Sequence, residues 1–273
     1  MLADVLAYLR CPVCHDRLAQ AGPAVRCPRG HAYDVARQGY VALATRVTHQ
    51  GDDAAMVAAR ERLLASGAYD FLDAAIVAAT RGHGGLVIDA GAGTGHHLAA
   101  VLDARPGSVG LALDVSKPAL RRAARAHPRA GAVLADTWRR LPVADRVADV
   151  VLNVFAPRNG AEFARVLRRD GVLVVVTPGE EHLAELTGAL RPVRVDPDKE
   201  RRLDAALARW FRPEERRRLR HRMRLTRDQV AALVAMGPAA RHTSPAELAA
   251  ALAALPEPAT VTAVVDVRRY RPR

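Results

Sequence analysis

The segment LVIDAGAGTG at residues 86–95 decides the fold of this chain. It joins a short aliphatic run, Leu86 to Ile88, to a glycine-rich turn, and residues 98–102 follow with the apolar spacing of a helix. A strand that passes through glycines into a helix brings backbone amides and the positive end of the helix dipole together. The segment therefore predicts a ligand site at the carboxyl end of a strand.

The segments around this turn repeat the alternation of strand and helix. Strands are expected at 109–114, 132–136, 148–155, 171–177 and 260–270, and helices at 117–126, 160–168 and 180–190. Upstream, residues 54–80 have a helical pattern that Ser66 and Gly67 break. Continuous apolar strands between amphipathic helices predict an α/β fold, with a mostly parallel sheet covered on both faces.

The composition is that of a globular protein, with 50% hydrophobic and 26% charged residues. The 41 basic residues exceed the 29 acidic ones, which gives a formal net charge of +12. Residues 191–230 hold 14 basic and 7 acidic residues, a local excess of 14 − 7, or +7. Such an excess favours a polyanionic partner, although a solvated helical face or an arginine-rich coding bias would produce it too.

The chain shows no sign of a membrane or secretory segment. No apolar run reaches the roughly 18 residues of a membrane span. Residues 1–4 lack the basic start and apolar stretch of a signal peptide. We therefore expect a cytoplasmic protein that has no membrane partner.

All three cysteines lie near the amino terminus, where Cys11, Cys14, Cys27 and His31 have the spacing C-x2-C-x12-C-x3-H. An odd, clustered set suits a disulfide framework poorly, whereas paired thiolates and an imidazole suit tetrahedral zinc. His15 is a competing imidazole, but it follows Cys14 directly and would have to point the same way. Four protein ligands leave no open position for a catalytic water. The pattern therefore predicts a structural zinc ion, against the alternative of three free cysteines.

The glycine turn distinguishes between two nucleotide-binding fingerprints. The dinucleotide pattern G-x-G-x-x-G would need glycine at position 96, which is His96. Asp89, Gly91, Gly93 and Gly95 instead form acid-x-Gly-x-Gly-x-Gly, which resembles motif I of class I S-adenosylmethionine-dependent methyltransferases. That resemblance implies a Rossmann-like, mostly parallel, seven-stranded sheet with S-adenosylmethionine bound at this turn.

Polar and aromatic residues end the next strands. Asp114 ends the second strand, where a carboxylate accepts hydrogen bonds from ribose hydroxyls, as it also would for NAD. Asp136 ends the third, where methyltransferases of this fold contact the adenine. Asn153, Phe155 and Pro157 end the fourth, where such enzymes meet the reacting nucleophile. Asn153 would position a base rather than deprotonate it, because an amide takes no proton, and Phe155 would stack on that base. The alternatives are that the segment is an ordinary strand end with a turn proline and that Phe155 is a core residue.

Further segments complete a pattern that covers the chain, most weakly beyond residue 190. They are Asp34, Gly39–Val41, Gly51–Asp52, Gly67 with Tyr69, Leu113–Lys117, and Thr177–Gly179 with His182–Leu183. Together with the zinc module and the glycine turn, they resemble the 23S rRNA guanine-N1 methyltransferase family. That family includes the tylosin- and mycinamicin-resistance methyltransferases.

The resemblance implies transfer of a methyl group to N1 of a guanosine in a domain II hairpin loop of 23S rRNA, and with it macrolide resistance or a housekeeping role. It places Tyr69, His96, His97 and His182 in the cofactor pocket. Its domains would be a zinc-binding RNA-recognition module at 1–45, a helical connector at 46–80 and a methyltransferase domain with a basic carboxyl-terminal region at 81–273. A homodimer is compatible with this scheme.

Two other functions stay open on the sequence alone. The sheet motifs do not identify the methyl acceptor, so a small molecule such as a quinone or an antibiotic could replace RNA. A relative that binds RNA but has lost the reaction would keep the same pattern.

Overall fold

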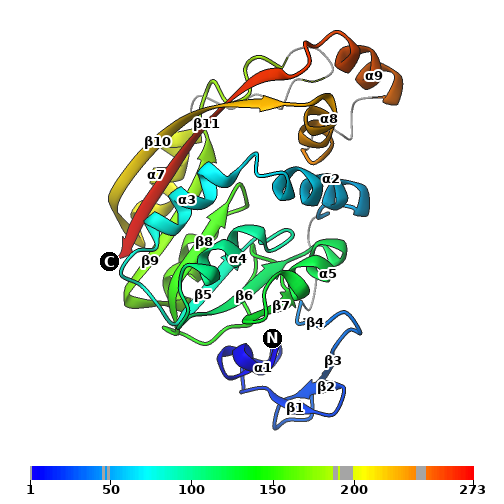
Figure 1. Ribbon diagram of the computed structural model, residues 1–273. Helices are drawn as coiled ribbons and strands as arrows, with labels where there is room; N and C mark the ends of the chain where they lie inside the picture. Colours follow the sequence, from blue (N-terminus) through cyan, green and yellow to red (C-terminus); the bar gives the residue numbers. More distant parts are fainter. Residues whose placement is uncertain (1, 45–46, 48–49, 187–189, 191–198, 238–243) are drawn as a thin grey trace.

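The computed structural model describes residues 2–44, 47, 50–186, 190, 199–237 and 244–273. A central sheet has helices on both faces, a small amino-terminal module lies at one end, and α8 (Arg227–Ala235) and α9 (Pro245–Ala253) lie at the other (Figure 1). The sheet strands are β4 (Tyr40–Ala42), β5 (Leu86–Ala90), β6 (Val109–Asp114), β7 (Ala130–Leu134), β8 (Ala148–Val154), β9 (Leu167–Pro178), β10 (Phe211–Leu225) and β11 (Ala259–Pro272). Their order is β10-β11-β9-β8-β5-β6-β7-β4.

The strands from β9 to β4 are parallel to one another, and β10 and β11 are antiparallel additions. Alternate residues of β9 point to opposite faces: Val174 packs in one hydrophobic core, and Val175 packs in the other. The first core includes residues of α2 (Ala54–Ala65), α3 (Asp70–Ala79), α4 (His96–Asp103) and α5 (Lys117–Ala126). The second includes α1 (Leu2–Val5) and α6 (Gly160–Val166). Burial on both faces confirms the predicted α/β class.

Apart from the helix expected at 180–190, the predicted elements are confirmed with small shifts at their ends. The helical pattern at 54–80 is two helices, α2 and α3, and Gly67 between them adopts φ +78°. The described sheet has eight strands, one more than the seven expected. The additional strand is β4, whose residues pair with Ala132 to Leu134 of β7 in parallel register. The three residues of β4 are too few to show a strand pattern in the sequence.

The helix expected at 180–190 is wrong for residues 180–185, which form turns. The amides of Gly179 and Leu183 donate to Val264 and Thr262 of β11, each over 2.9 Å. Leu183 adopts φ +59°, which a helix does not allow. The segment is therefore fastened to β11 rather than to its own helical turns, and residues 187–189 lie outside the described part of the chain.

Much of the arginine-rich stretch is a strand, not a helical face. Residues 191–198 lie outside the described part, and α7 (Lys199–Ala208) follows them. Residues 211–225 then form β10, which pairs with β11 along nearly its whole length. It lies at the edge of the sheet, where charged side chains discourage pairing with another chain. Among the described helices, none combines the length and apolar character that crossing a bilayer requires.

The amino-terminal module consists of α1, the 3-10 turn Leu6–Tyr8, and a sheet of β1 (Ala19–Ala21), β2 (Ala24–Arg26) and β3 (Ala32–Asp34). It joins the large sheet through the loop before β8. The Arg10 amide donates to Pro142 and the Ala144 amide to Tyr8, each over 2.9 Å. The expected domain boundary at residues 45 and 46 lies outside the described residues.

Candidate functional site

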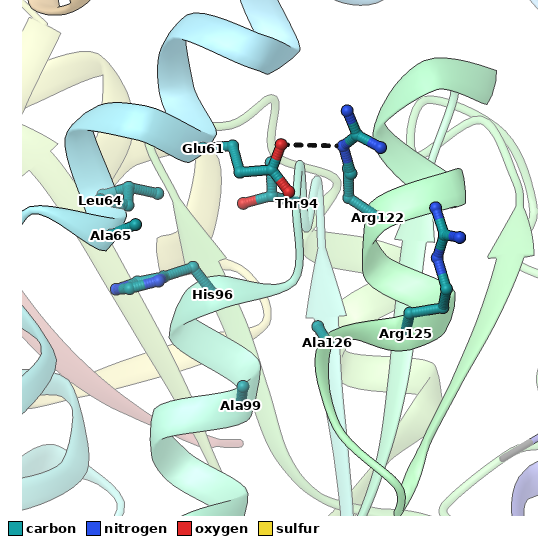
Figure 2. Close-up of a pocket in the computed structure, with 9 residues that line it drawn as sticks. All are labelled: Glu61, Leu64, Ala65, Thr94, His96, Ala99, Arg122, Arg125 and Ala126. Carbon is teal, nitrogen blue, oxygen red and sulfur yellow. Dashed lines mark ion pairs between the residues drawn. The ribbon is translucent and has the colours of Figure 1, made fainter.

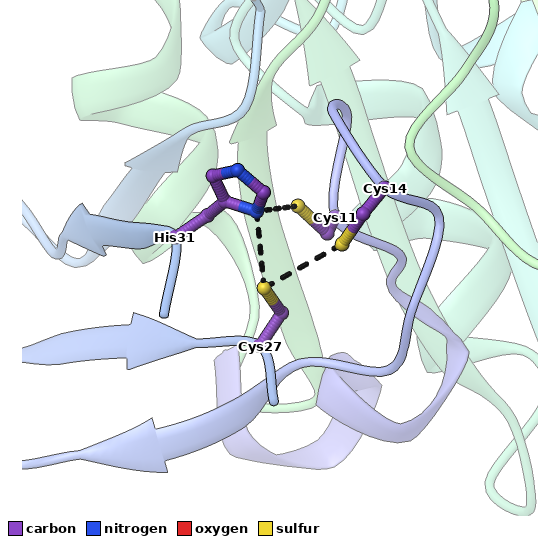
Figure 3. Close-up of side chains that lie close together, drawn as sticks. All are labelled: Cys11, Cys14, Cys27 and His31. Carbon is purple, nitrogen blue, oxygen red and sulfur yellow. Dashed lines mark hydrogen bonds between the residues drawn. The ribbon is translucent and has the colours of Figure 1, made fainter. Parts of the chain in front are cut away.

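The four predicted metal ligands converge on one point (Figure 3). Their ligand atoms, from Cys11, Cys14, Cys27 and His31, all lie within 4.8 Å of one another. Two turns bring them together: the His15 amide donates to Cys11 over 2.9 Å, and the Gly30 amide donates to Cys27 over 3.0 Å. Three sulfurs and one nitrogen at this separation fit a tetrahedral zinc ion, and they occupy all four positions.

The cluster has an outer hydrogen bond of the kind that orients metal ligands. The Tyr33 hydroxyl lies 3.1 Å from Cys11 Sγ. His31 Nδ1 lies 3.3 Å from Cys27 Sγ and 3.6 Å from Cys11 Sγ, so this nitrogen faces the centre of the cluster. His15, the competing imidazole, does not join the cluster. A hydrogen bond from Tyr33 to a ligand sulfur favours its thiolate form.

The glycine turn after β5 has a geometry that larger residues could not adopt. Gly91 has φ +89°, and a Cβ atom there would lie 2.4 Å from the Ala156 Cβ. Gly95 has φ +79°, and its Cβ would lie 3.1 Å from the backbone of Ala123. Gly93 has φ +54°. The glycines let the turn pass close to both the loop after β8 and helix α5.

Two acidic residues, Asp89 and Asp114, lie next to this turn. The Asp114 carboxylate accepts the amides of Gly93 and Ser116, each over 2.8 Å. Burial raises the pKa of Asp114. Burial, and then the charge of Asp114, raise the pKa of Asp89 to about 7. Asp89 Oδ1 has no hydrogen-bond partner in the described part of the chain, so the turn keeps a buried acceptor for a bound ligand or water.

A cavity of about 200 Å³ opens above these strand ends. It brings together the predicted residues Gly91, Gly93, Asp114, Phe155 and Pro157, which come from three neighbouring strands. The other residues that line it are Gln50, Gly51, Asp52, Arg60, Val115, Ala135, Thr137, Val154 and Ala156. Glycines, the partly buried carboxylate of Asp114 and aliphatic side chains fit the carboxyl, ribose and adenine parts of S-adenosylmethionine.

Arg60 of α2 was missed by the sequence reasoning. Its Nη2 donates to Asp52 Oδ2 over 2.6 Å and to the Met236 carbonyl over 3.2 Å. Arg60 thus connects the segment before α2 to the end of α8. A single arginine within an alanine-rich helix gives no signal in the sequence.

Asn153 and Phe155 differ in how they meet the cavity. Asn153 is wholly buried, and its Nδ2 donates to the carbonyls of Ala90 and Pro157 over 3.0 and 2.8 Å. It therefore holds the loop after β8 against β5, and its contact with a base stays a prediction. Phe155 is 40% exposed and adopts φ +51°, a strained conformation for a bulky residue. The strain presents its ring at the mouth of the cavity.

Besides Asp89, Gly95 and Asn153, five other predicted residues do not line this cavity. Asp136 is buried, and its Oδ1 accepts the Trp138 amide over 2.9 Å. His182 Nδ1 accepts the Val264 amide over 3.2 Å, and its ring centroid lies 6.1 Å from that of Phe155. Tyr69 is buried at the start of α3, beside Phe71. The last two residues, His96 and His97, lie at the start of α4. For all five, contact with the cofactor stays a prediction.

His96 and His97 both bind Asp73 of α3. His97 Nδ1 lies 2.6 Å from one oxygen of Asp73, and His96 Nε2 lies 2.9 Å from the other. Burial opposes the charge of Asp73, but these hydrogen bonds outweigh it and lower its pKa to about 2. The pair of histidines therefore fastens α4 to α3.

A second hollow, of about 350 Å³, lies on the flank of the glycine turn between α2, α4 and α5 (Figure 2). His96 and Thr94 line it beside an ion pair, in which Arg122 Nε lies 2.9 Å from Glu61 Oε2. Asp114 and Phe155 do not line this hollow, so it is separate from the cavity above the strand ends.

The comparison with protein families agrees with both parts of the chain. A zinc-ribbon family described as "RlmA, N-terminal" matches residues 9–44, and a family described as "Methyltransferase domain" matches residues 88–175. The fold resembles that of the YcgJ protein from Bacillus subtilis, with a TM-score of 0.52 over 74% of this chain and 97% of that one, at 16% identity. Fold and site together define a class I S-adenosylmethionine-dependent methyltransferase that carries a zinc ribbon.

The full-length relatives give the family within that class. The chain is 57% identical to a protein from Micromonospora griseorubida named "Putative 23S rRNA (guanine-N(1)-)-methyltransferase", over 100% of both chains. It is 48% identical to the 23S rRNA (guanine(748)-N(1))-methyltransferase of Streptomyces fradiae, over 100% of this chain and 99% of that one. The chain belongs to the 23S rRNA (guanine-N1)-methyltransferase family.

Proposed function

We propose that this protein transfers the methyl group of S-adenosylmethionine to N1 of a guanosine in a domain II hairpin loop of 23S rRNA. The observation that carries the proposal is the full-length similarity to two methyltransferases with this named activity. The cavity supports it, because it is lined by a glycine turn, the partly buried carboxylate of Asp114 and an exposed aromatic ring. The biological role that we propose is resistance to tylosin-type macrolides.

S-adenosylmethionine, when bound, supplies a methyl group on a positively charged sulfur. Gly91 and Gly93 let the backbone approach it closely, and Asp114 offers carboxylate oxygens for ribose hydroxyls. Phe155 would supply a ring on which the guanine can stack. Transfer would leave S-adenosylhomocysteine, and N1 of guanine would give up its proton to solvent as it takes the methyl group. Holding the two reactants in line accounts for much of the acceleration, and Asn153 contributes by fixing the loop.

The parts of the chain divide the work in this proposal. Residues 1–45 bind RNA, residues 46–80 form a helical connector that contributes to the cofactor pocket, and residues 81–273 transfer the methyl group. The proposal includes contact with the cofactor by five residues predicted from the sequence: Tyr69, His96, His97, Asp136 and His182. The enzyme acts in the cytoplasm, where ribosomes assemble. Association into a homodimer is a further proposal, which analytical ultracentrifugation tests.

The decisive experiment incubates the protein with labelled S-adenosylmethionine and unmodified 23S rRNA, and maps the label. Label at N1 of one hairpin-loop guanosine is the expected result, and the same RNA with adenosine at that position is the matched control. Label on a quinone or an antibiotic, and none on RNA, would overturn the proposal in favour of a small-molecule methyltransferase. Salt-dependent RNA binding with no methyl transfer would identify an inactive relative.

A further inference from the structure

The loop after β7 presents a tryptophan to solvent. Trp138 is 55% exposed. Among the described residues, the other exposed large apolar side chains are Val13, Val47 and Phe155. Phe155 lines the cavity, so two exposed aromatic rings follow strands of the same sheet edge.

The backbone of this loop is fixed, so the exposure of Trp138 is not a result of looseness. The Trp138 amide donates to Asp136 Oδ1, and the Arg139 amide donates to the Asp136 carbonyl, each over 2.9 Å. Asn159, at the start of α6, donates its side-chain amide to the Thr137 carbonyl over 3.0 Å. Hydrogen bonds on both sides of Trp138 therefore fix the backbone of the loop.

Trp138 lies next to a residue that lines the cavity but does not line the cavity itself. Thr137, its neighbour in the chain, lines the cavity, whereas Trp138 does not. Arg139 and Arg140, which follow it, are exposed. An aromatic ring beside arginines, on a fixed loop at the edge of a reaction site, is the arrangement that single-stranded nucleic acids bind by stacking.

We propose that Trp138 stacks on an unpaired RNA base that neighbours the target guanosine in the hairpin loop. The inference rests on the proposed function, because it takes RNA as the methyl acceptor. Phe155 receives the target base, and Trp138 holds the adjacent base outside the cavity. Trp138 is then a positioning residue, which fixes how far the hairpin loop opens. The neighbouring arginines contact the phosphates of the same nucleotides.

Fluorescence tests the contact directly, because the chain has two tryptophans and one can be removed. Trp210 packs against the core, with the Arg209 guanidinium 4.9 Å from its ring centroid, and Trp210→Phe leaves Trp138 as the only tryptophan, which can be excited selectively over the tyrosines. We expect the domain II hairpin RNA to quench this emission and S-adenosylhomocysteine alone to leave it unchanged. Quenching by S-adenosylhomocysteine would overturn the inference, since Trp138 would then cover the cofactor.

Methylation kinetics of two variants complete the test. Trp138→Ala is expected to raise KM for the hairpin about tenfold, which corresponds to one stacked base. Trp138→Phe keeps a ring and should restore most of the affinity, and both variants should keep the melting temperature because the side chain is exposed. Equal KM for the parent and both variants would overturn the inference and leave the proposed function standing. Absence of methyl transfer by the parent protein would instead refute the proposed function.

Discussion

The zinc module and the large sheet are stabilised in different ways within one chain. The strands of the module have three residues each, and its order depends on four side chains that meet within 4.8 Å. The sheet has strands of up to 15 residues, and aliphatic side chains bury both faces of its centre. A module of this size buries too little apolar surface to fold alone, so we expect it to depend on metal as well as on the packing of α1 against the large sheet.

The largest expected effect is the loss of the module when one ligand is removed. Cys27→Ala takes away a thiolate from a site whose metal contributes about 10–16 kcal/mol in comparable modules. We expect stoichiometric zinc to disappear and amide protection to be lost in β1 to β3, while β5, β6 and β8 remain protected. Elemental analysis and hydrogen exchange measure the two effects.

His15→Ala is the matched control for this variant. His15 is a neighbour of Cys14 in the chain, but it does not join the cluster. The control should keep both zinc and amide protection. If Cys27→Ala kept one zinc per chain and a protected module, the contrast between a metal-dependent module and a burial-dependent sheet would be wrong.

The second effect concerns the sheet at the point where it binds ligand. Gly91→Ala would place a Cβ 2.4 Å from the Ala156 Cβ at φ +89°, so the turn must shift. We expect a loss of about 1–3 kcal/mol in the free energy of unfolding and about tenfold weaker S-adenosylhomocysteine binding. Calorimetry measures the binding, and urea denaturation measures the stability.

Gly107→Ala is the matched control, because no atom lies within 4 Å of the added Cβ and its φ is ordinary. It should change neither the affinity nor the stability appreciably. An equal loss in both variants would mean that the geometry of the glycine turn does not select glycine at position 91.

The two regions also show which features a sequence reveals. The cysteine spacing and the glycine turn were predictable because residues close in the chain set their geometry. The turn at 180–185 and the strand β10 were not, because their partners lie far away in the sequence. Leu183 is fastened to Thr262, and both Arg216 and Arg218 pair with Asp266.

The same reasoning applies to single residues of the site. Asp114 and Phe155 were predictable from their places at strand ends, and both line the cavity. Asn153 also lies at a strand end, but its side-chain amide donates hydrogen bonds to backbone carbonyls inside the protein. Arg60 and Trp138 belong to no recognisable sequence motif. The contact of Arg60 with Met236 and the exposure of Trp138 become visible only in the folded structure.

A third, smaller effect concerns the contribution of buried ion pairs to the stability of the sheet. Asp266 is buried in β11, 2.9 Å from Arg218 and 3.2 Å from Arg216. Burial opposes its charge, but hydrogen bonds from Arg218 and Arg216 outweigh this and lower its pKa to about 2. A lowered carboxyl pKa stabilises the fold above the unfolded pKa of about 3.9, and this stabilisation is lost as the pH falls toward 2.

Asp266→Asn should therefore cost about 1 kcal/mol at pH 7, because half-exposed arginines are partly screened by solvent. The difference from the parent protein should shrink at pH 3, as urea denaturation at both pH values would show. Glu181→Gln is the matched control, since Glu181 and its partner Arg220 are both exposed. A difference that stays constant from pH 7 to pH 3 would contradict the role assigned to the charge of Asp266.

The smallest effect on stability is expected at the end of β10. Arg222 and Arg224 are exposed, and neither has an ion pair with any residue that the structure describes, in contrast to Arg216 and Arg218. Their charge is free for phosphates. The double variant Arg222→Ala with Arg224→Ala should leave the free energy of unfolding within about 0.5 kcal/mol of the parent. RNA affinity should fall several-fold, and the slope of log affinity against log salt should flatten by about 0.7–0.9 per lost contact.

The matched variant for this last comparison is Arg216→Ala with Arg218→Ala, which removes the same charge from the same strand. It should lower the free energy of unfolding because it removes two of the three arginines that lie within 4 Å of the buried Asp266 carboxylate, and Arg268 alone remains. Its salt slope should change less than that of the first pair, since arginines that neutralise an acid release fewer counterions. Filter binding between about 50 and 200 mM salt measures both slopes. Equal slopes for the two double variants would mean that RNA contacts the whole of β10, and that pairing with Asp266 does not decide which arginines are available.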